Sequence, residues 1–130
     1  MNIEITSFYA ALLGLWLIVL SARVIAYRRK KLVALGHVDD RALEWRVRAQ
    51  ANLTEYAPIA LILLGTIENS GVSTWAVHGL GVLLLLGRVF HGWSFSFAGG
   101  QMRFRIIGML LTLTMVGVSS LLVLWISAFG

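Results

Sequence analysis

Apolar residues fill four long stretches of this chain, and polar or turn-forming residues separate them. Residues 5–22 and 106–130 carry no charge, and residues 74–95 carry only one arginine. A helix needs about 20 mostly apolar residues to cross the hydrocarbon core of a bilayer. The pattern therefore predicts four membrane-spanning helices, at residues 6–26, 43–67, 74–95 and 106–129.

The segments between these stretches predict how the helices connect. Residues 23–48 are polar and basic, so we expect a loop that leads into the second helix near Asp40. Residues 68–71 (ENSG) and 98–100 (AGG) are typical of short turns. Short connections make neighbouring helices antiparallel. We predict one domain over residues 1–130, an all-α integral membrane four-helix bundle with up-down topology.

Composition supports a membrane protein and excludes some chemistry. The chain is 58% hydrophobic and 13% charged, whereas soluble domains are about one quarter charged. It has no cysteine, which excludes disulfides and cysteine nucleophiles. A cleaved signal peptide would need a basic start, but Glu4 is the only charge before the first stretch.

The positions of the basic residues predict orientation. All eleven lie in residues 23–48 (eight) or 88–105 (three), which up-down topology places at one end of the bundle. Basic loops of membrane proteins face the cytoplasm, so we expect both termini outside and favour a bacterial inner membrane. The basic run at residues 28–31 is interpreted as a topology anchor near anionic headgroups, and nucleic acid is not an expected partner.

A polar stripe interrupts the second apolar stretch. Arg48, Asn52 and Glu55 are spaced i, i+4 and i+7, which places them on one helical face. Tyr56 shares an edge of this face, and Pro58 frees a backbone acceptor beside it. Ionisable groups at membrane depth cost about 2.5–3.5 kcal/mol and usually face a bundle interior or a wet cavity. The stripe is either a network that joins helices or a binding site.

A surplus of arginine favours the binding site. The other arginines predicted at the level of Arg48 are Arg23, Arg88, Arg103 and Arg105. The only acid in the buried part of the chain is Glu55. Arginine binds carboxylates through paired hydrogen bonds and stays charged, so this set suits a ligand with several carboxylates and one ammonium. The alternative for each arginine alone is an end-of-helix residue whose side chain snorkels to the interface.

At residues 44–58 the sequence, EWRVRAQANLTEYAP, closely resembles the second-helix signature of the MAPEG family, Arg-Ala-Gln-x-Asn-x-x-Glu-Tyr-x-Pro. The name denotes membrane-associated proteins in eicosanoid and glutathione metabolism. The resemblance is to its leukotriene C4 synthase and microsomal glutathione transferase branches. Residues 20–23 (LSAR), Arg88 and residues 101–103 (QMR) are also similar to the family.

The resemblance implies a homotrimer that binds glutathione, as co-substrate, between neighbouring subunits near the cytoplasmic face. The glutathione contacts that it implies are Arg23, Arg48, Gln50, Asn52, Glu55, Tyr56 and Arg88. It assigns stabilisation of the glutathione thiolate to Arg103, with Arg105 as a rival. The thiolate would attack a lipophilic small molecule that enters from the bilayer, and no metal is required.

One departure from the family pattern leaves the activity open. The eicosanoid enzymes carry tyrosines in the third span, whereas residues 90–95 here read FHGWSF. His91 is the candidate substitute as a hydrogen-bond partner, although a headgroup-level histidine is the alternative. The leading function is a glutathione transferase, with peroxidase activity as an extension. The alternatives are a non-catalytic lipid-binding or scaffold protein and, less favoured, a small multidrug transporter, whose essential first-span acid is missing.

Overall fold

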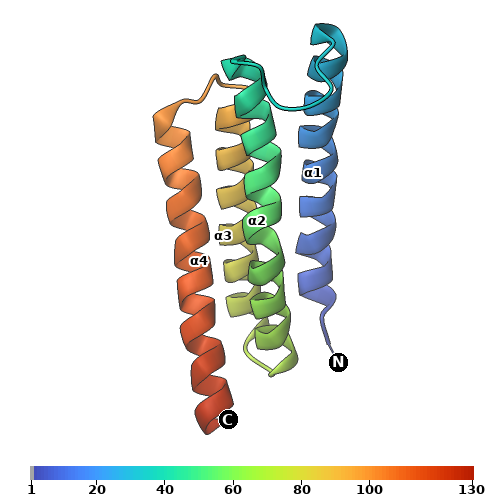
Figure 1. The fold of residues 1–130 in the computed structure, drawn as a ribbon. Helices are drawn as coiled ribbons and strands as arrows, with labels where there is room; N and C mark the ends of the chain where they lie inside the picture. Colours follow the sequence, from blue (N-terminus) through green and yellow to red (C-terminus); the bar gives the residue numbers. More distant parts are fainter. Residues whose placement is uncertain (1) are drawn as a thin grey trace.

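The computed structural model describes residues 2–130, which form four α-helices. They are α1 (Glu4–Lys31), α2 (Arg41–Asn69), α3 (Thr74–Ser96) and α4 (Met102–Phe129). The helices run alternately up and down, so the two chain ends lie at the same end of the bundle (Figure 1). The predicted all-α four-helix bundle is confirmed.

The helices are longer than predicted at the basic end. Residues 27–31, beyond the predicted end of the first helix at residue 26, extend α1 to Lys31, and α4 begins at Met102 rather than near residue 106. Arginine and lysine are good helix formers, and the basic last turn of α1 complements the negative end of the helix dipole. Hydropathy marks the part of a helix that lies in lipid, not its full hydrogen-bonded length.

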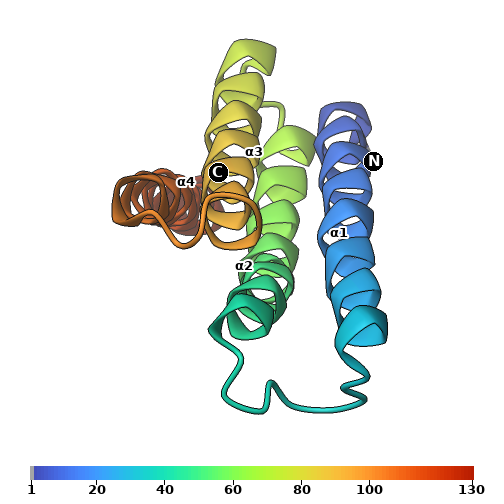
Figure 2. The ribbon, with the colours of Figure 1, turned by 90° about the horizontal axis from the view of Figure 1, so that it is seen from above.

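The helices pack around a central pair. α2 and α3 contact each other, and each also contacts both α1 and α4. Within residues 2–130, α1 and α4 make no direct contact, and they lie on opposite sides of the bundle when it is seen from above (Figure 2). The core is apolar, with Leu20, Leu64, Leu84 and Met115 fully buried.

The outer surface is apolar as well, which fits a lipid environment. Leu15 and Ile18 of α1 and Leu121 and Leu124 of α4 are more than half exposed. By length and composition α1, α3 and α4 are able to cross a membrane. α2 has 29 residues, so it is long enough, but it carries more charge than the other three. The chain is therefore an integral membrane bundle in which α2 is the polar helix.

Glycines bring α3 and α4 into backbone contact. A Cβ atom added to Gly108 of α4 would lie 2.7 Å from the carbonyl oxygen of Gly87 and 2.7 Å from the amide nitrogen of His91. A Cβ added to Gly87 would lie 2.5 Å from the Thr112 hydroxyl. Small residues at membrane helix interfaces permit such an approach. This contact places Thr112 beside the polar residues of α3.

Glu68 joins the last turn of α2 to the first turn of α1. Its carboxylate accepts hydrogen bonds from the backbone N–H groups of Ile5 and Thr6, both at 2.8 Å, and from the Thr6 hydroxyl at 2.7 Å. The first N–H groups of a helix have no intrahelical partner, so Glu68 satisfies two of them from another helix. The sequence pattern assigns Glu68 to a turn, but it lies in the last turn of α2.

Asp40 begins α2, as predicted. Its side chain accepts hydrogen bonds from the Leu43 N–H at 3.1 Å and from the Tyr27 hydroxyl at 2.8 Å. The hydrogen bond from Tyr27 lowers the pKa of the Asp40 carboxyl, and the backbone N–H groups of Leu43 and Ala42 lower it further, while partial burial opposes the shift.

This lowered pKa predicts a pH-dependent stability. A carboxyl with a lower pKa in the folded state stabilises the fold above its unfolded pKa of about 3.9, and loses that effect as pH falls through the folded value. We expect Asp40→Asn to lower the melting temperature modestly at pH 7, and the difference from the parent to disappear as pH falls through the folded pKa of Asp40. The control is Asp39→Asn. An Asp40→Asn difference that persisted in acid would assign the effect to shape rather than charge.

Candidate functional site

Arg48 and Glu55 form an ion pair on the surface of α2. Two N–O distances, Nη1 to Oε1 and Nη2 to Oε2, are both 3.4 Å. It is the one ion pair among residues 2–130. Glu55 is the central residue of α2, with 14 residues on either side between Arg41 and Asn69, or about 21 Å of helix. Each side chain is 49% exposed, so a charged pair lies on an uncovered face at mid-helix.

Arg88 lies behind this pair and is fully buried. Its side chain is 1% exposed, although arginine is almost never buried without an ionic partner. The guanidinium donates to Asn52 Oδ1 at 2.5 Å, to the Asn52 carbonyl at 3.3 Å and to Thr112 Oγ1 at 2.9 Å. It also contacts Met109 Sδ at 3.4 Å and lies 5.1 Å from the centre of the Tyr56 ring. Within the described chain all these partners are neutral.

The Arg88 contact orients the Asn52 amide. Because Asn52 Oδ1 accepts from Arg88, the Asn52 NH₂ group remains as a donor, one turn from Arg48 on the same helical face. The stripe predicted from spacing is therefore real, and a buried cation supports it from α3. The structure brings together Arg48, Asn52, Glu55, Tyr56 and Arg88.

Arg23 belongs to a different group of residues. It donates from Nε to the Ser96 hydroxyl at 2.7 Å and from Nη2 to the Ser96 carbonyl at 2.6 Å, and it stacks 3.8 Å over the Phe97 ring. Arg46 of α2 stacks 4.4 Å over the Tyr27 ring. These side chains border a groove of about 550 Å³, which is lined by Val19, Ala22, Arg23, Ala26, Tyr27, Lys30, Arg46 and Phe97.

The two groups lie on opposite sides of α2. Successive helical residues are about 100° apart, so Arg46 and Arg48 point about 200° away from each other. Gln50 follows Arg46 by one turn and shares its face, whereas Asn52 shares the face of Arg48. No hydrogen bond or ion pair joins the two groups within residues 2–130. The chain therefore presents Arg23 and Gln50 on one side and the Arg48 stripe on the other.

The structure separates the two rival arginines at the start of α4. Arg105 stacks 4.4 Å over the Phe95 ring, whose centre is 5.0 Å from that of the buried His91 ring. Arg103 is exposed and makes no hydrogen bond or ion pair in the described part of the chain. Arg105 is thus held beside His91, and Arg103 is available to a ligand or a neighbouring molecule.

Sequence reasoning missed the groups that hold these arginines in place. Thr112 and Met109 bind Arg88 from α4, and Ser96 binds Arg23. Thr112 lies four residues after Gly108, the small residue that allows α3 to approach α4. That spacing is the one sequence signal that could have identified Thr112. No group of three potential metal ligands occurs in residues 2–130.

The fold and site define an integral membrane four-helix protein with an arginine-rich polar site on its second helix. The model of the MAPEG family matches residues 6–129, and the chain belongs to the MAPEG family. It is 36% identical over 91 residues to the inner membrane protein YecN of Escherichia coli strain K12, and equally to that of strain O6:H1, covering 70% of each chain. The predicted family is confirmed, and the relatives support a bacterial inner membrane.

Proposed function

We propose that this protein is a membrane-bound glutathione transferase. The observation that carries the proposal is the stripe of Arg48, Asn52 and Glu55 at the middle of α2. Arg48 and Glu55 are half exposed, and the buried Asn52 is bound by the buried Arg88. Charged side chains on an uncovered face at membrane depth are costly. Here Arg48 and Glu55 lie on one face of α2, and the buried Arg88 behind them has no acidic partner. A bound ligand explains this arrangement better than helix packing does.

The charges of the site match glutathione. Glutathione carries two carboxylates and one ammonium at neutral pH. Glu55 is the acceptor for the ammonium, and Arg48 and the Asn52 NH₂ group are donors to a carboxylate. Arginine offers paired hydrogen bonds to carboxylates. Arg88 acts through Asn52, whose amide it orients, and Tyr56 closes the edge of the site.

The site is completed by a neighbouring copy in a homotrimer. Arg23 and Gln50 face away from Arg48 within one subunit, so they meet the same glutathione only if they come from the next subunit. A neighbour on this face of α2 would also remove the Arg48–Glu55 pair from lipid. The half-exposed pair and the divided arginines therefore support the same assembly.

Catalysis requires the glutathione thiolate. A thiol with a pKa near 8.5 is mostly protonated at pH 7, and an adjacent cation favours the thiolate. Arg103 supplies that cation, and the thiol proton passes to water. The sulfur then forms a bond to an electrophilic carbon of a lipophilic substrate from the bilayer, while the leaving group departs with its electron pair. Reduction of lipid hydroperoxides by glutathione is an extension of the same chemistry.

The basic ends of the helices face the cytoplasm in this proposal. Arg23, Arg48 and Arg103 then lie where glutathione is supplied, and both termini lie outside. The positive-inside rule supports this orientation.

A non-catalytic lipid-binding protein is the second candidate. The third helix favours it, because residues 90–95 (FHGWSF) contain no tyrosine, whereas the eicosanoid enzymes carry tyrosines in the third span. Trp93 is 40% exposed and lies 5.1 Å from the Phe104 ring. Such an aromatic surface suits an acyl chain without any need for a thiolate.

Conjugation of glutathione to 1-chloro-2,4-dinitrobenzene by the detergent-purified protein distinguishes the transferase from the non-catalytic lipid-binding protein. We expect turnover by the parent, and a loss of about tenfold or more in kcat for Arg103→Ala, with glutathione affinity retained. Arg105→Ala is the matched variant, and we expect a smaller effect because its guanidinium is stacked on Phe95. Glutathione binding is measured separately by calorimetry.

The binding measurement decides the role of Glu55. We expect Glu55→Gln to weaken glutathione binding by about tenfold or more, because a charge-assisted hydrogen bond is worth roughly 1.5–3 kcal/mol. Unchanged binding would show that the ammonium lies elsewhere. If the parent protein neither binds nor conjugates glutathione, the lipid-binding candidate replaces the transferase.

A further inference from the structure

The C-terminal turns of α1 extend beyond the hydrocarbon core. The helix has 28 residues, or about 42 Å, whereas the core of a bilayer is about 30 Å thick. Its last four residues, Arg28 to Lys31, are all basic. These turns therefore lie at the level of the lipid headgroups, outside the site described above.

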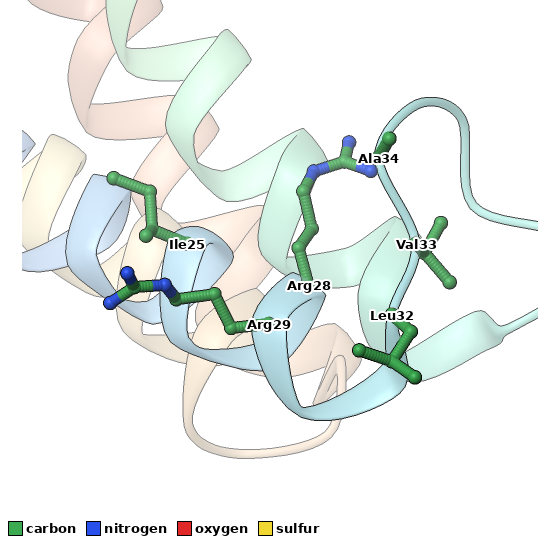
Figure 3. A pocket seen from close by; sticks show the side chains of 6 residues that line it. All are labelled: Ile25, Arg28, Arg29, Leu32, Val33 and Ala34. Carbon is green, nitrogen blue, oxygen red and sulfur yellow. The ribbon is translucent and has the colours of Figure 1, made fainter.

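Two of these arginines border a groove at the end of the helix (Figure 3). The groove measures about 410 Å³ and is lined by Ile25, Arg28, Arg29, Leu32, Val33 and Ala34. Arg28 donates from Nη1 to the Gly36 carbonyl at 2.7 Å, which holds the following loop over the helix end. Figure 3 shows Arg28 extending toward Ala34 and Arg29 extending on the other side, beside Ile25. The lining combines guanidinium groups with an apolar floor and contains no acid.

Leu32 occupies a costly position at the mouth of this groove. It ends α1 with φ = 56° and ψ = 39°, the left-handed conformation that favours glycine. A residue with a Cβ atom in that conformation costs about 1–2 kcal/mol, because the Cβ atom approaches the following carbonyl oxygen. Leu32 is also 92% exposed, and Leu35 of the same loop is 86% exposed. Neither the backbone nor the packing of this subunit explains a leucine there, so a covering ligand is indicated.

We infer that this groove binds an anionic glycerophospholipid. The guanidinium group of Arg29 contacts the phosphate, and Leu32 and Ile25 contact the first part of an acyl chain. Arg28 adds positive charge from the other side of the groove and holds the loop through Gly36. A phospholipid is the ligand that carries both groups at headgroup depth. The contribution of a basic residue near an anionic membrane surface is about 1 kcal/mol, and a guanidinium group adds paired hydrogen bonds to that attraction.

The test compares charge-matched variants of the full-length protein in detergent. The probe is dioctanoyl phosphatidylglycerol, with dioctanoyl phosphatidylcholine and glycerol phosphate as comparison ligands, and binding is followed by native mass spectrometry. We expect Arg28→Gln with Arg29→Gln to weaken phosphatidylglycerol binding by about tenfold or more, and Lys30→Gln with Lys31→Gln, which removes the same charge next to the groove, by about threefold or less.

Two further variants keep the result independent of loop folding. Arg29→Gln leaves the Arg28–Gly36 bond in place and is expected to weaken binding by several-fold. Leu32→Gly removes the side chain proposed to contact the acyl chain, so it is expected to weaken lipid binding. It also relieves the left-handed leucine, so the melting temperature is expected to stay the same or rise.

The inference is overturned if the double arginine variant and the double lysine variant weaken phosphatidylglycerol binding equally, because an equal loss indicates non-specific charge attraction. It is also overturned if phosphatidylcholine binds as tightly, or if glycerol phosphate competes at the same concentration as the lipid. In the last case the groove is a site for a free phosphate anion.

Discussion

Replacing Gly108 with leucine is expected to prevent the protein from forming a stable four-helix bundle. Even the Cβ atom would lie 2.7 Å from the Gly87 carbonyl oxygen and 2.8 Å from His91 Cβ. Overpacking a core costs about 1–3 kcal/mol when side chains are able to adjust. Here the obstacle is backbone, so α3 and α4 must separate along much of their contact. We expect little monodisperse protein on size exclusion and a melting temperature lowered by about 10 °C or more.

The matched control lies on the same helix. A Cβ added to Gly117 meets no atom within 4 Å, so Gly117→Leu makes the same chemical change in open space. We expect it to behave like the parent in detergent. Equal melting temperatures for the two variants would contradict the close crossing of α3 and α4.

Replacing Arg88 with methionine is expected to separate stability from binding. The change keeps most of the side-chain length and removes a charge that has only neutral partners within the described chain. Removing a lone buried charge relieves its desolvation cost, which offsets the hydrogen bonds that Asn52 and Thr112 lose. We expect the melting temperature without ligand to be unchanged or raised, and glutathione affinity to fall on the order of 100-fold.

The reason for the binding loss is the Asn52 amide. Without the Arg88 donor, Asn52 Oδ1 has no charged partner, and the amide no longer presents its NH₂ group to the ligand. Thermal shift measurements over a glutathione titration give both quantities from one experiment. Met109→Leu is the control, because it removes only the sulfur contact to Arg88 and is expected to bind glutathione normally. A protein that unfolds on Arg88→Met would make Arg88 a structural residue instead.

Hydrophobic patterning predicted the number, order and approximate positions of the helices. It placed the helix ends less well, because lipid exposure selects for apolar residues, whereas a helix can continue beyond the lipid. α1 continues through Arg28 to Lys31, and α4 starts at Met102, four residues before the predicted start. The same limit applies to Glu68. Its type and place in an ENSG segment favour a turn, and only the packed N-terminus of α1 explains why the helix retains it.

Spacing within α2 predicted one face of the site. Arg48, Asn52 and Glu55 follow from the helical period alone, and the structure confirms that Arg48 and Glu55 form a pair. The resemblance to a family grouped all the contacts together, Gln50 among them, without saying which subunit supplies each. The structure of one subunit divides them, with Arg23 bound to Ser96 on the far side of α2.

The sequence by itself determined a membrane bundle, its family and a polar second helix, because hydropathy and helical period are properties of neighbouring residues. Only the tertiary structure decided that Arg88 is buried against Asn52 and Thr112, and that Arg105 rather than Arg103 is stacked on Phe95. The two Arg88 contacts join residues 24 and 36 positions apart. The contact with Thr112 depends on the glycine crossing of α3 and α4, and no local pattern encodes how closely two helices approach.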